Sequence, residues 1–113
     1  MPFDGTETLF SDLHGHAPLP LVEFVRHLNR HLPGARLLET DGPGRTGGWW
    51  LDLAVAGLTP AVEWREATGF GLYGPGPTLP ERPVAQLTYP ADAAARLARF
   101  VNAWSETRGA EAA

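Results

Sequence analysis

The sequence contains no cysteine and no lysine, and it has only two serines, Ser11 and Ser105. The absence of cysteine excludes disulfide bonds, thiolate metal sites and cysteine nucleophiles. Ser11 stands close to an aspartate and a histidine in the sequence, but a catalytic triad is assembled in space and not along the chain. We therefore expect no catalytic residues.

A basic surplus and a long apolar run are also missing. The nine arginines are scattered among thirteen acidic residues, and the net charge is −4. Proteins that bind nucleic acid usually carry a basic stripe, so we expect no direct contact with nucleic acid and none with an anionic membrane. No apolar run approaches the roughly 20 residues that a membrane-spanning helix needs. The start of the chain lacks the pattern of a signal peptide, so we expect a cytoplasmic protein.

The length of 113 residues and the apolar fraction of 43% indicate one folded domain, residues 1–113. Within it, residues 1–17 are mostly polar and are interpreted as an N-terminal arm. Residues 19–32 are predicted to be helical, because Leu21, Val25 and Leu28 recur on one face of a 3.6-residue repeat.

Short alternating segments follow this helix. Residues 49–56 are the clearest strand, because apolar and other residues alternate along them. Residues 35–40, 61–66 and 70–73 are also predicted strands, and 84–89 is either an edge strand or an extended lead into the last helix.

A second helix is predicted over residues 91–107, with Gly109 ending it and residues 108–113 forming a frayed tail. The whole pattern predicts an α+β fold. In it, an antiparallel meander sheet of three to four strands packs against an N-terminal and a C-terminal helix, in the order α-β-β-β-(β)-α.

Trp50 is the strongest candidate for a binding residue. If Trp49 and Trp64 point at the helices, Trp50 points the other way, on the same face as Asp52, Glu63 and Arg65. Tryptophan and arginine dominate binding hot spots, so these four residues are predicted to form a partner-binding surface. Alternatively, the N-terminal arm or the 74–83 loop covers Trp50, and the charged residues form a cross-strand salt-bridge ladder.

The four histidines lie within 18 positions: His14, His16, His27 and His31. A His-x-His pair on a loop together with a His-x-x-x-His pair on a helix is a possible zinc arrangement, because residues four apart on a helix point the same way. Solvated or half-buried histidines with no metal are the simpler interpretation, since spacing alone does not show that the ligands converge.

Three stretches of the chain carry a resemblance: Gly47–Leu53, Val62–Arg65 and Gly69–Gly71. Together they are similar to a small uncharacterised bacterial domain that occurs alone or beside a helix-turn-helix segment. The resemblance implies a regulatory role, and DNA contact would then need a partner, because this chain has no recognisable helix-turn-helix of its own.

The sequence thus favours a non-enzymatic protein-interaction or regulatory module that needs no cofactor and binds a protein partner, or itself as a homodimer, through the aromatic sheet face. The alternative is a zinc-binding protein or small metal-dependent enzyme that uses the four histidines. A third possibility is a small-ligand pocket between the sheet and the helices, closed by the 74–83 loop.

Overall fold

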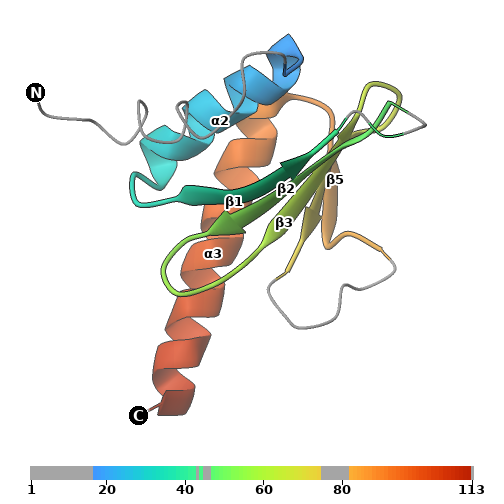
Figure 1. Cartoon of the computed structure of the whole chain (residues 1–113). Coiled ribbons are helices and arrows are strands. Elements are labelled where there is room, and N and C mark those ends of the chain that lie inside the picture. The colour runs from blue at the N-terminus through green and yellow to red at the C-terminus, as the bar shows by residue number, and fades with distance from the viewer. Residues whose placement is uncertain (1–16, 43, 45–46, 75–81, 113) are drawn as a thin grey trace, which may run out of the picture.

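The computed structural model describes residues 17–42, 44, 47–74 and 82–112, with 107–112 as backbone only. Its elements, in chain order, are α2 (Leu19–His31), β1 (Arg36–Asp41), β2 (Trp49–Ala54), β3 (Ala61–Arg65), β4 (Gly69–Tyr73), β5 (Ala85–Leu87) and α3 (Pro90–Ala112). The strands form one sheet in the order β1-β2-β3-β4-β5, and every neighbouring pair is antiparallel (Figure 1). The α+β class and the meander are therefore confirmed. The sheet has five strands because the first and the last predicted segments both join it.

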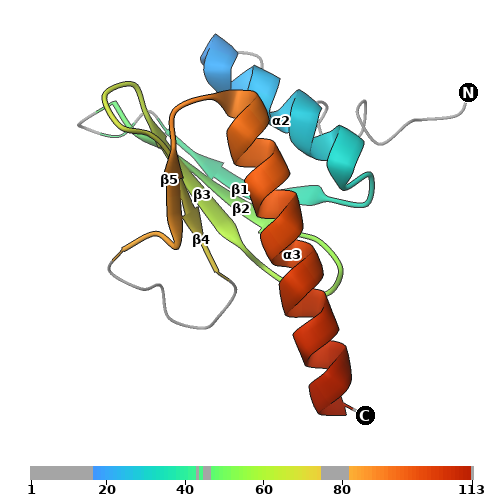
Figure 2. The ribbon, with the colours of Figure 1, turned by 180° about the vertical axis from the view of Figure 1, so that it is seen from behind.

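Both helices lie on the same side of the sheet and cross each other there (Figures 1 and 2). The core fills the layer between them. Phe24 of α2 stacks on Phe70 of β4 with ring centroids 5.0 Å apart, and both side chains are fully buried. Burying one such side chain contributes about 1.5–3 kcal/mol, so this contact is a main support of α2 on the sheet.

Helix α2 follows the predicted amphipathic pattern. Its buried positions are one face of the helix: Leu21, Phe24, Val25, Leu28 and Asn29. The helix begins after Pro18, and the Leu32 backbone N–H donates to the Leu28 carbonyl oxygen at its end. The observed limits agree with the predicted range of 19–32 to within one residue.

Helix α3 is longer than the sequence pattern predicted. It continues through Gly109 to Ala112 and extends beyond the sheet (Figure 2). One glycine costs a helix only about 1 kcal/mol relative to alanine, and alanine and glutamate after it favour the helix again. The predicted end of this helix at Gly109 is therefore wrong. Among the described residues, no helix is both long and apolar enough to cross a membrane.

A two-residue turn lies between Val55 and Leu58, in the connection from β2 to β3. Val55 and Leu58 exchange two backbone hydrogen bonds, of 3.0 and 2.8 Å. Ala56 and Gly57 lie between them with φ of 53° and 76°. Two-residue hairpin turns of type I′ require a positive φ at both central positions, which glycine adopts freely and alanine does not. The chain therefore reverses at Ala56 and Gly57, so Ala56 belongs to the turn and not to the predicted strand 49–56.

Asn29 is the exception to the apolar interior. Its side chain is 2% exposed, and neither its Nδ2 nor its Oδ1 has a hydrogen-bond partner in the part of the chain that the structure describes. A buried amide without partners costs about 1–3 kcal/mol of stability.

Candidate functional site

The face of the sheet opposite the helices is called the outer face here. It carries the side chains that alternate with the buried ones along each strand. On it, Trp50 of β2 lies directly between Asp41 of β1 and Glu63 of β3. The next row across the same strands holds Glu39, Asp52 and Ala61, followed by Tyr73 on β4.

Trp50 is held in place by two contacts on this face. Its Nε1–H donates a hydrogen bond of 3.0 Å to Oδ1 of Asp52. Its ring packs against that of Tyr73, with centroids 5.2 Å apart and planes tilted by 43°. These contacts leave the indole half-buried, and Ala61, which lies between Asp52 and Tyr73 in the register, is only 1% exposed. Trp50 points away from the helices as expected, but as a fixed part of the surface and not as a free-standing side chain.

Glu63 and Arg65 form an ion pair within strand β3. Nη2 of Arg65 donates to Oε2 of Glu63 over 3.3 Å, and the side chain of Arg65 is 43% exposed and that of Glu63 31%. The predicted cross-strand ladder is therefore wrong for this pair, because both partners belong to one strand and lie two residues apart. At this exposure, such a pair contributes between about 0 and 1 kcal/mol.

Tyr73 is a member of the outer face that sequence reasoning missed. Burial raises the pKa of its phenol above the usual 10.0, the Glu63 carboxylate raises it further, and the Arg65 guanidinium lowers it. The phenol therefore stays protonated over the physiological range. Tyr73 reaches the site because the pairing of β2, β3 and β4 places it diagonally across from Trp50. The spacing of residues along the sequence does not reveal this pairing.

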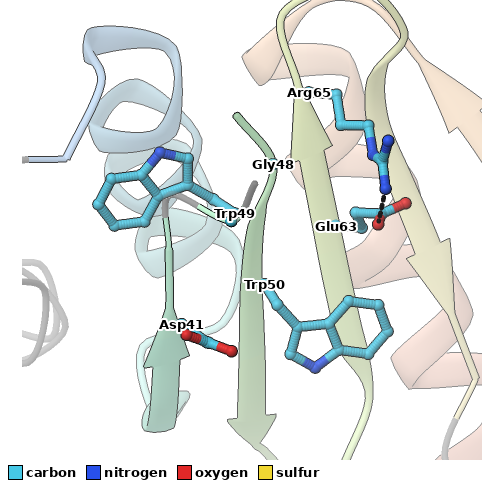
Figure 3. A pocket seen from close by; sticks show the side chains of 7 residues that line it. Asp41, Gly48, Trp49, Trp50, Glu63 and Arg65 are labelled. Atoms are coloured by element: carbon cyan, nitrogen blue, oxygen red, sulfur yellow. Dashed lines mark hydrogen bonds and ion pairs between the residues drawn. The ribbon is translucent and has the colours of Figure 1, made fainter. Parts of the chain in front are cut away.

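A hollow of about 160 Å³ lies beside Trp50 on the outer face. Figure 3 shows Asp41 on β1, Trp50 on β2, and Glu63 and Arg65 on β3 around it. Gly48 opens this space because it has no side chain, and the stem of Arg65 lies over it: a Cβ at Gly48 would be 3.4 Å from Cγ of Arg65. Drug-sized ligands occupy about 300–1,000 Å³, so this hollow fits a single side chain of a partner better than a cofactor.

The histidines lie away from the outer face where the structure describes them. His27 is half-buried and His31 is exposed, and both are on α2, in the helical layer. His14 and His16 lie outside the described residues. Among residues 17–42, 44, 47–74 and 82–112, no group of three or more metal-ligating side chains comes together. The four-histidine site thus stays a prediction.

The third prediction, a ligand pocket between sheet and helices, involves a loop of which residues 75–81 are outside the described part of the chain. The layer where it would lie is occupied by buried side chains of both helices and the sheet. A larger hollow of about 320 Å³ lies at one end of the sheet, where Pro20 of α2, Trp64 of β3 and Tyr89 before α3 line it. The ligand pocket closed by the 74–83 loop stays a prediction.

No known protein family matches the chain, and neither a curated protein nor a solved structure matches it. Function is therefore inferred from the outer face itself.

Proposed function

We propose that the protein is a non-enzymatic interaction module that binds a protein partner through the outer face. One observation carries the proposal: Trp50 is fixed by Asp52 and Tyr73 at the centre of a sheet face that neither helix covers. A partner that packs on a fixed indole does not need to order it first, so little conformational entropy is lost on binding.

The groups around Trp50 support binding in preference to chemistry. The indole, the phenol and the guanidinium belong to the residue types that are enriched at protein interfaces, and the carboxylates around them would belong to a polar rim. Arg65 and Glu63 are more than 30% exposed, so they would form the wet rim. The half-buried Trp50 and the buried Tyr73 against it would form the apolar centre.

The proposal extends to a regulatory role in the cytoplasm. Its support is the resemblance described above and the cysteine-free, acidic composition. In that role the partner, and not this chain, would contact DNA.

Replacement of Trp50 by alanine tests the proposal. The tagged protein is recovered from the cells that produce it, and the proteins retained by the native chain and by Trp50→Ala are quantified by mass spectrometry. We expect Trp50→Ala to lose a specific partner that the native chain retains, because the contact centre is gone. Tyr89→Ala is the matched control, since Tyr89 is a 67% exposed aromatic at the start of α3. Equal retention by native chain and Trp50→Ala, with the fold of the variant verified by circular dichroism, would overturn the proposal.

The zinc-binding alternative is distinguished by native mass spectrometry of protein purified without chelator. One zinc per chain, lost in a His27→Ala/His31→Ala double variant, would support that alternative. The same spectrum reports whether the protein is a homodimer.

A further inference from the structure

The outer face carries more negative than positive charge. Four carboxylates belong to it by their register positions: Glu39, Asp41, Asp52 and Glu63. Among the paired strand positions that the structure describes, two guanidinium groups share it, those of Arg36 and Arg65, and Arg65 forms an ion pair with Glu63. A partner that neutralises this surplus is favoured over one that adds to it.

This charge balance disfavours a second copy of the chain as the occupant. A symmetric dimer through the outer face would place the same surplus of carboxylates on both sides of one interface. Like charges across an interface suppress such pairing. The occupant is therefore a different molecule with a positive surface.

The hollow over Gly48 has the shape and the charge to take one cationic side chain. The carboxylates of Asp41 and Glu63 stand on its two sides, and Trp50 lies between them and also lines it (Figure 3). Arginine and lysine combine an apolar stem, which packs on an indole, with a charged end that pairs with carboxylates.

We propose that the outer face binds a basic, extended segment of a partner protein, with one arginine or lysine side chain in the hollow between Asp41 and Glu63. This inference rests on the proposed function and names the chemistry of the partner. An extended segment suits the surface, because alternate side chains of a strand-like peptide point the same way and lie flat on a sheet. Arg65 occupies part of the hollow, so a bound cation competes with it for Glu63.

Fluorescence anisotropy with a labelled peptide of alternating arginine and alanine, about eight residues long, tests the inference. A peptide of alternating glutamate and alanine is the charge control. We expect only the basic peptide to bind, with an affinity that falls as salt rises from roughly 50 to 300 mM. The double variant Asp41→Asn/Glu63→Gln should weaken binding about tenfold or more.

Two further variants separate this site from general attraction to an acidic protein. Asp92→Asn/Glu106→Gln removes the same charge from exposed positions on α3, and it should leave the affinity unchanged. Arg65→Gln removes the competing cation, and it should tighten binding about threefold. Equal weakening by the two double variants, or weaker binding by Arg65→Gln, would overturn the inference.

The outcomes also separate this inference from the proposed function. If the basic peptide does not bind, yet Trp50→Ala loses its partner from cells, only the charge assignment fails. If Trp50→Ala retains the partner, both the proposed function and the charge assignment fail.

Discussion

Asn29 offers a test in which a substitution should stabilise the protein. Its amide is 2% exposed and has no hydrogen-bond partner among the described residues, which costs about 1–3 kcal/mol. Alanine removes both unpaired atoms and improves the helix propensity of α2 by roughly 0.5 kcal/mol. The three heavy atoms removed leave a small cavity, which costs about 1 kcal/mol. We therefore expect Asn29→Ala to raise the free energy of unfolding by about 1–2 kcal/mol.

Urea and thermal unfolding followed by circular dichroism measure this change. For a domain of 113 residues, the expected gain corresponds to a rise in Tm of roughly 4–8 °C. The isosteric control Asn29→Asp should have the opposite effect, because it buries an unpaired carboxylate. Burial raises the pKa of that introduced carboxyl, so its penalty should shrink as the pH falls toward about 4. A loss of more than about 1 kcal/mol in Asn29→Ala would show that the amide is hydrogen-bonded in solution, and would refute the reasoning.

Three further predictions concern the sheet and the outer face. Gly69→Ala should destabilise the protein by about 3 kcal/mol or more, because at φ 79° the added Cβ would collide with the backbone of β5. The control Gly47→Ala, at φ 80° but in open space, should lower the free energy of unfolding by about 1 kcal/mol, as urea titration of both variants would measure. Ala56→Asn should stabilise the β2–β3 turn by up to about 1 kcal/mol, since asparagine tolerates positive φ better, and an unchanged unfolding midpoint would contradict this. In the Tyr89→Phe variant, absorbance at 295 nm should show Tyr73 ionising above pH 10.0, because burial and a nearby carboxylate raise its pKa. Because the folded state binds this proton more tightly than the unfolded state, the protonated phenol contributes to the free energy of unfolding below pH 10.0, and this contribution is lost as the pH rises further. Ionisation of Tyr73 below pH 10.0 would contradict the structure.

The sequence predicted the parts of the fold that depend on local periodicity. Alternation along residues 49–54 placed Trp50 and Asp52 on one face and Leu51 on the other, as the burial pattern shows. The 3.6-residue repeat of Leu21, Val25 and Leu28 located α2 in the same way. Both patterns are strong because each element buries one side only.

Strand β1 shows why the rest of the outer face could not be predicted. Its register shifts between Leu37 and Glu39, where a β-bulge interrupts the alternation. The bulge places Glu39 and Asp41 on the outer face, although simple alternation from Arg36 would turn them inward. Asp41 therefore joins Trp50 through an irregularity that depends on pairing with β2, and sequence spacing does not report pairing.

Tyr73 and the β2–β3 turn were missed for related reasons. The contact between Tyr73 and Trp50 is diagonal across two strands and depends on the register of β2, β3 and β4. The positive φ of Ala56 is imposed by the paired strands, against the preference of alanine. Tertiary pairing determines both features.

Site-specific photo-crosslinking in cells tests the central claim most directly, namely that the outer face is the partner-binding surface. A photoreactive amino acid is placed at Gln86, which lies on the outer face in the same row as Glu63, and separately at Arg99, which is exposed on α3 in the helical layer. The account predicts a single crosslinked partner from position 86, lost when Trp50→Ala is added, and none from position 99. Crosslinks to that partner from position 99 but not from position 86 would contradict it.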